Sequence, residues 1–111
     1  MFFNKSNDID YELKNGKGFI TEYNKLGNLF FEGEYINGER NGKGREFHHK
    51  GGIIFKGEYL NGKRNGKGKE YYNGELKFEG EYLNGERNGK GKEYDYNSKL
   101  IFEGEYLKGK R

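Results

Sequence analysis

The chain has 111 residues, of which 31% are hydrophobic, and a mean hydropathy of -1.25, which alone would suggest too little apolar surface for a core. Ten tyrosines and nine phenylalanines argue against disorder, because disordered segments are poor in aromatic residues. The 21 basic and 18 acidic residues nearly balance, which disfavours nucleic-acid binding, and the absence of cysteine excludes disulfides and thiolate metal sites.

We expect no targeting signal at the N-terminus. No apolar run approaches the roughly 18 residues of a transmembrane helix, and residues 1–5 lack the apolar stretch of a signal peptide. We therefore expect an intracellular, cytoplasmic protein, with a membrane-peripheral position as an alternative.

A tandem repeat begins at Lys14. Residues 14–18 match residues 40–44, fuller copies of 23 to 24 residues begin near 31, 55 and 78, and a half copy begins at 102. Residues 1–13 match poorly and are predicted to be a degenerate N-terminal segment or cap, which leaves residues 14–111 as the array. A period of this length predicts units that bury their apolar faces only against their neighbours.

Each repeat is predicted to be one β-hairpin. From Leu76 to Tyr82 apolar residues alternate with charged ones, which is the period of a half-buried strand. Asn61-Gly62 and Asn65-Gly66 follow the equivalent strand and are both interpreted as reversal signals, with a shorter return strand over residues 67–72. The predicted fold is all-β: a single elongated antiparallel sheet of stacked hairpins, open at its ends.

A glycine recurs at the centre of the aromatic face of every copy. Glycine inside a strand costs about 0.5 to 1 kcal/mol relative to alanine. Its recurrence predicts that a neighbouring ring lies over it, and the alternative is a bulge that twists the sheet. These glycines are Gly33, Gly57, Gly80 and Gly104.

The segment from Phe55, FKGEYLNGKRNGKGKEYYNG, resembles the MORN (membrane occupation and recognition nexus) repeat. The family pattern is an aromatic residue, x-Gly-Glu, a second aromatic residue, Asn-Gly, a basic residue, Gly-x-Gly and a closing turn. This resemblance implies a rod or trough of hairpins without catalytic activity, used in scaffolding, dimerisation or membrane-proximal attachment. Tyrosine stands where many members have tryptophan, which leans toward antitoxin-like bacterial relatives, so that function stays open.

Other chemistry is not supported by the sequence. Residues 62–68 look like a phosphate-binding loop but are one residue short before the lysine and have glycine where Ser or Thr must hold Mg²⁺. His48 and His49 are adjacent on a predicted strand, so they face opposite ways and cannot chelate one ion. Strand carboxylates such as Glu79 and Glu81 are expected to pair with basic residues across the strands. We predict no catalytic site, no metal site and no cofactor.

Two surfaces are candidate interaction sites. The first is the aromatic face, because a contiguous apolar patch usually marks an interface; the alternative is that its rings fill the trough by stacking on each other and on the glycines. It comprises Phe31, Tyr35, Phe55, Tyr59, Phe78, Tyr82, Phe102 and Tyr106. The second is a basic rim that could attract anionic lipid, with solvation and intramolecular pairing as the alternative. It comprises Arg40, Lys43, Lys63, Arg64, Lys67, Arg87 and Lys90.

The leading functional prediction is a non-catalytic module for protein–protein interaction or assembly. The partner would dock on the aromatic face or on an exposed edge strand, and the alternative is a peripheral adaptor that binds an anionic membrane surface. Because the last copy supplies residues 102–108 but no return strand, a homodimer through that edge is also predicted.

Overall fold

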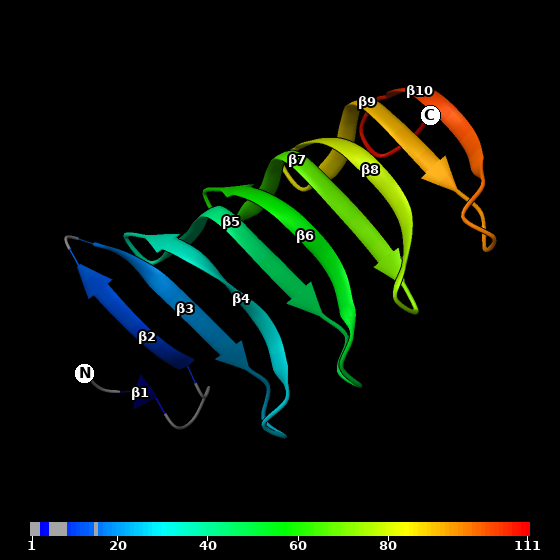
Figure 1. Cartoon of the computed structure of the whole chain (residues 1–111). Coiled ribbons are helices and arrows are strands. Elements are labelled where there is room, and N and C mark those ends of the chain that lie inside the picture. Colours follow the sequence, from blue (N-terminus) through cyan, green and yellow to red (C-terminus); the bar gives the residue numbers. More distant parts are fainter. Residues whose placement is uncertain (1–2, 5–8, 15) are drawn as a thin grey trace.

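The computed structural model describes the backbone of residues 3–4, 9–14 and 16–111, and side chains from residue 16 onward. These residues form one ten-stranded antiparallel sheet in which every strand pairs with its neighbours in chain order (Figure 1). The strands are β1 (Phe3–Asn4), β2 (Ile9–Lys14), β3 (Lys17–Tyr23), β4 (Leu29–Ile36), β5 (Glu39–Phe47), β6 (Ile53–Leu60), β7 (Lys63–Tyr72), β8 (Glu75–Leu83), β9 (Glu86–Tyr94) and β10 (Leu100–Tyr106).

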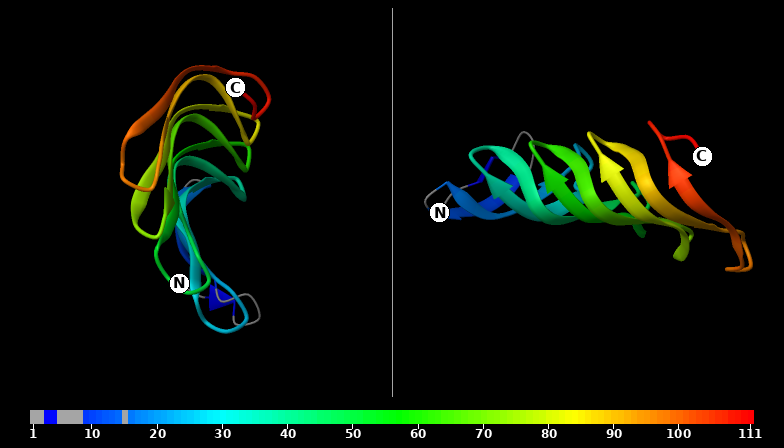
Figure 2. Two further views of the ribbon diagram at one scale, coloured as in Figure 1. Left: turned by 90° about the vertical axis from the view of Figure 1, so that its right-hand side faces the viewer. Right: turned by 90° about the horizontal axis from the view of Figure 1, so that it is seen from above.

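The sheet is elongated, twisted and bent, as the end-on view in Figure 2 shows. Its principal extents are 46 × 29 × 17 Å. The described residues contain no helix, and therefore none that could cross a membrane. The predicted all-β array of consecutive hairpins is confirmed.

The predicted N-terminal cap, residues 1–13, lies entirely outside the residues whose side chains are described. Within residues 1–13, the described backbone forms β1 and most of β2, and β2 pairs with β3 in regular register from Ile9↔Glu22 to Lys14↔Lys17. The sheet therefore continues upstream of the first full repeat.

The first Asn-Gly pair of each repeat forms the predicted reversal. At Asn61-Gly62 both residues have positive φ, 51° and 85°, which is the conformation of a type I′ turn. Each turn also bonds to the repeat before it, because the Gly62 N–H donates to the Arg40 carbonyl at 2.9 Å and the Gly85 N–H to the Arg64 carbonyl at 2.8 Å. The turns thus extend the ladder of the sheet at one edge.

The second Asn-Gly pair is not a reversal, and this prediction is wrong. Asn65-Gly66 lies inside β7, which begins at Lys63, and the register shifts between Gly57↔Gly68 and Tyr59↔Arg64. The Glu58 carboxylate accepts the Lys67 N–H at 2.8 Å within this bulge, and a side chain on Gly66 would collide with that carboxylate. Positive φ is needed at the bulge as well as at the turn, so the two signals look alike in sequence.

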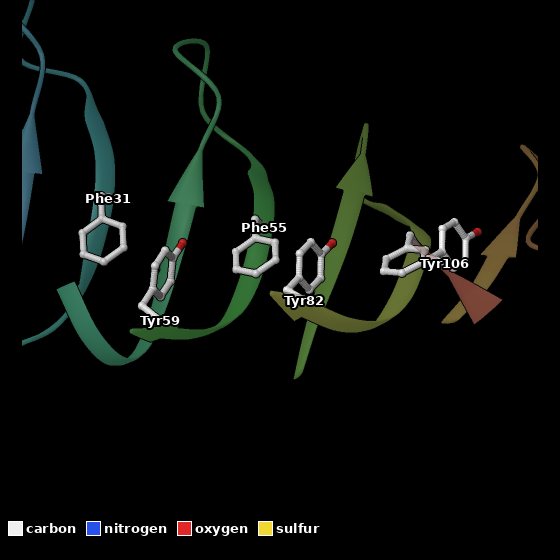
Figure 3. Close-up of a cluster of buried hydrophobic side chains, with 6 residues drawn as sticks. Phe31, Phe55, Tyr59, Tyr82 and Tyr106 are labelled. Carbon is white, nitrogen blue, oxygen red and sulfur yellow. The ribbon is translucent and has the colours of Figure 1, made fainter. Parts of the chain in front are cut away.

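The core is a single row of rings on one face of the sheet (Figure 3). Phe31, Phe55 and Phe78 are fully buried, and each meets the tyrosine of the next repeat edge-on, with ring centroids 5.1 to 5.3 Å apart. Edge-to-face pairs at this distance are favourable beyond the area they bury. Every copy therefore anchors the following one.

Candidate functional site

The aromatic face is the core of the molecule and not an open surface. Six of its eight predicted rings are buried, while Tyr35 and Phe102 are half-buried. The stacking alternative describes the structure, since the rings pack on one another and on glycines. Little of this face is left for a partner.

Arginine side chains complete the cover of these rings. The Arg64 guanidinium lies 4.0 Å from the centroid of Phe55, and Arg40 and Arg87 lie over Phe31 and Phe78 at 3.8 and 4.1 Å. A guanidinium over a ring face is attracted by the ring quadrupole while its charge stays available for pairing. A single-layer sheet can thereby bury its aromatic residues without a second layer.

Each of these arginines shares a carboxylate with a tyrosine of the core. Glu46 accepts hydrogen bonds from Arg64 Nε at 3.0 Å, from Arg64 Nη2 at 2.9 Å and from the Tyr59 hydroxyl at 2.5 Å. Glu70 does the same for Arg87 and Tyr82. Burial alone would raise the pKa of Glu46, but the donors outweigh it and the pKa is lowered. The pKa of Tyr59 is raised by burial and by its bond to Glu46.

The residues of the predicted basic rim lie on two different faces of the sheet. Arg40, Arg64 and Arg87 cover the aromatic face, whereas Lys43, Lys67 and Lys90 line a groove on the other face, and Lys63 lies at the start of β7. The rim was predicted as one row because the bulge was read as a turn. Arg64 and Lys67 are three positions apart in β7 and lie on opposite faces of the sheet.

The face opposite the rings carries a long groove. It runs across the strands from Phe19 to Glu105 and has a volume of about 860 Å³. Its floor is a line of glycine backbones paired directly across six consecutive strand junctions: Gly33, Gly44, Gly57, Gly68, Gly80, Gly91 and Gly104.

The glycines are required by the rings on the far side of the sheet. A methyl group at Gly44 would lie 2.7 Å from a ring carbon of Phe31, and one at Gly33 would also meet the backbone of the next strand. The prediction that a ring lies over these positions is confirmed. On the opposite side of the sheet the glycine line has no side chains of its own and forms the groove floor, with Gly57, Gly80 and Gly104 partly exposed and the other four buried.

Two rows of charged residues flank the glycine line and form the groove walls, and all of their members except Glu34 line the groove. The Glu32 row, which is continuous in the strand register, is Glu32, Arg45, Lys56, Lys69, Glu79, Lys92 and Glu103. The Glu34 row, joined by register pairs and by the bulge hydrogen bonds, is Glu34, Lys43, Glu58, Lys67, Glu81, Lys90 and Glu105. Pairing of these carboxylates with basic residues across strands was predicted, but among the described residues only Glu32 forms such an ion pair, with Arg45. Glu79 instead accepts the Tyr94 hydroxyl at 2.5 Å, and Glu81 accepts the Lys90 backbone N–H at 2.8 Å.

The other predicted residues form no site. His48 and His49 lie in the loop after β5 and not on a strand, and their ring centroids are 4.1 Å apart, so the prediction that they face opposite ways is wrong. No group of three metal-ligating side chains occurs among the described residues. Residues 62–68 are a turn and a bulged strand rather than a loop that opens a helix. Sequence reasoning missed the shared carboxylates Glu46 and Glu70, although their recurrence with an arginine in each copy was a usable signal.

The architecture is that of a repeat array whose building block is one hairpin. The family model for the MORN repeat matches residues 31–52, 55–75 and 78–98, which is more than half of the chain. The chain belongs to the MORN-repeat family, a family of non-catalytic repeat modules that generally mediate interactions with proteins or membranes. A search of curated proteins finds no match to the chain.

Proposed function

We propose that this chain is a non-catalytic binding module that holds an extended segment of a partner protein in the glycine-floored groove. The observation that carries the proposal is the unbroken line of seven glycines between two charged rows. A floor without side chains allows close approach of another backbone, and long polar side chains on both sides can orient it.

The dimensions favour an extended chain over a helix. The two rows are separated by two residues along each strand, or about 7 Å. A helix with its side chains is about 10 to 12 Å wide and would rest on the walls. The six spacings of about 4.8 Å between the seven strands give the floor a length of about 29 Å, which an extended segment of about nine residues would fill.

The other predicted modes of binding draw less support. The rings of the aromatic face are occupied by the chain's own arginines and tyrosines, and the basic rim is divided between two faces. A peripheral membrane role and a homodimer through the edge strand β10 stay predictions, as does an antitoxin-like role. The dimensions of the groove support the proposal that the partner is a protein segment.

The floor glycines and the turn glycines allow the proposal to be tested by NMR. Nine-residue peptides selected from a random display library against the immobilised chain would be titrated into ¹⁵N-labelled protein, and amide shifts would be followed by NMR. We expect shifts at the floor glycines, for example Gly57 and Gly80, and none at the turn glycines Gly62 and Gly85, which form a matched control. Selected peptides that shift only β10 or the turns, or a selection that yields no binder, would contradict the proposal.

A further inference from the structure

One position breaks the charge pattern of the groove. In the Glu32 row, the first strand of each repeat contributes Glu32, Glu79 or Glu103, but in the repeat from Phe55 it contributes Lys56. Lys56 is the direct register partner of Arg45 on one side and of Lys69 on the other. Three cations therefore stand side by side on neighbouring strands.

The fold does not need this arrangement. Like charges opposite each other across strands are destabilising, and the equivalent glutamates of the other repeats would alternate with their neighbours. Arg45 pairs with Glu32, but among the described residues no carboxylate lies within ion-pair distance of Lys56 or Lys69, and both are exposed. The cost to stability points to a role outside folding.

The surroundings strengthen the positive charge. Across β5, β6 and β7 the two rows contain five cations and only one carboxylate, Glu58. The carboxylate of Glu58 is already engaged by the Lys67 N–H of the bulge. The adjoining strands β4 and β8 each contribute two glutamates instead. A hollow lined by one sign of charge concentrates the field on its occupant.

We propose that Arg45, Lys56 and Lys69 form the specificity site of the groove and bind a short acidic stretch within an extended segment of the partner protein. This inference rests on the proposed function. The block spans two strand spacings, about 10 Å, which corresponds to about three residues of an extended chain. The glutamates on β4 and β8 disfavour further acidic residues beyond that stretch.

Residues at equivalent positions of the other repeats provide a mild substitution in the groove and a control substitution outside it. Lys56→Glu introduces the residue found at three equivalent positions, and Lys63→Glu introduces the residue found at its equivalents, Glu39 and Glu86. Both variants change the net charge equally and both suit the fold, but only Lys56 lines the groove. Circular dichroism spectra identical to wild type would verify that both variants are folded.

The probes are two fluorescein-labelled nine-residue peptides of glycine and serine with either three aspartates or three lysines at the centre. Binding is measured by fluorescence anisotropy at about 50 mM salt, where the Debye length exceeds the size of the block. We expect the aspartate peptide to bind wild type about tenfold more tightly than the lysine peptide. Lys56→Glu should weaken aspartate-peptide binding about tenfold, while Lys63→Glu should change it less than about twofold.

The outcomes separate the two proposals. If neither peptide binds wild type, the groove is not a peptide site and both proposals fall. If the peptides bind wild type equally, or if Lys56→Glu and Lys63→Glu behave alike, the specificity site is refuted while the groove as a peptide site stands. Co-sedimentation with phosphatidylserine vesicles that is lost only in Lys56→Glu, without peptide binding, would assign the block to lipid and overturn the inference.

Discussion

Replacing one floor glycine by alanine tests the link between the groove and the core. A methyl group on Gly68 would lie 2.6 Å from two ring carbons of Phe55 and 2.9 Å from a ring carbon of Tyr82. Normal carbon contacts are about 3.5 to 4.0 Å. Phe55 is fully buried under Arg64 and cannot swing aside. We therefore expect Gly68→Ala to be destabilising by overpacking.

The magnitude follows from two opposing effects. Overpacking a filled core typically costs about 1 to 3 kcal/mol, occasionally more. Alanine recovers about 0.5 to 1 kcal/mol of strand entropy relative to glycine. The contact is about 0.9 Å too short at Phe55 and about 0.6 Å too short at Tyr82. We therefore place the overpacking cost near the upper end and expect a net loss of about 2 to 2.5 kcal/mol.

Gly62→Ala is the matched control from the same repeat. No atom lies within 4 Å of a methyl group at Gly62, so the only cost is the positive φ of 85°. That conformation costs a non-glycine residue about 1 to 2 kcal/mol. The two variants thus separate steric overlap from backbone strain.

Urea unfolding followed by circular dichroism measures the loss of stability in both variants. With a slope of about 1 to 3 kcal/mol per molar urea, Gly68→Ala should lower the midpoint by about 1 M and by clearly more than Gly62→Ala. Adding Phe55→Leu to Gly68→Ala should return part of the loss, because contacting residues are not additive. A Gly68→Ala variant as stable as Gly62→Ala would refute the packing of the ring on the glycine line.

Three further expectations concern ionisable groups. The pKa values of Tyr59 and Tyr82 are raised by burial and by their glutamate partners, so alkaline titration by tyrosinate absorbance should show that they ionise only as the chain unfolds. Burial would raise the pKa of Glu70, but Arg87 and Tyr82 lower it, so its stabilisation is present above the unfolded value of about 4.3 and is lost in acid. Glu70→Gln should accordingly reduce stability at pH 7 and flatten its fall toward low pH, and a parallel acid profile would contradict this. Glu81→Ala should cost about 1.5 to 3 kcal/mol in urea unfolding, because its carboxylate accepts the Lys90 N–H in the bulge, and a loss within about 0.5 kcal/mol would show that the bulge does not depend on it.

The sequence predicts the sheet well because each strand carries its own signals. Alternation from Leu76 to Tyr82 sets the two faces, and Asn61-Gly62 fixes a reversal through residues that tolerate positive φ. The bulge at Asn65-Gly66 carries the same signal, which is why the return strand was predicted to begin too late. Local propensity reports the backbone conformation of a residue but not the element in which it is used.

Contacts between repeats were harder to predict than those within one repeat. Arg64 reads as a solvent-facing charge, yet it stacks on Phe55 and pairs with Glu46, 18 residues earlier in the chain. Its aliphatic stem and planar head allow it to cover a ring and bind a carboxylate together. Recognising this requires the register between strands, which the bulge shifts. The groove was missed for the same reason, since its floor is defined by glycines of different repeats.

The fold constrains the two groove walls differently, and this difference shows where specificity can reside. The bulge needs a carboxylate at the first-strand position of the Glu34 row, and every copy has glutamate there: Glu34, Glu58, Glu81 and Glu105. The bulge requires no carboxylate in the Glu32 row, and at the first-strand position of that row the copies differ, with Lys56 among three glutamates. Substitution in this row changes the charge of the groove while leaving rings, glycines and bulges intact. An array of near-identical repeats can therefore acquire a distinct binding site through the wall on which its bulges do not depend.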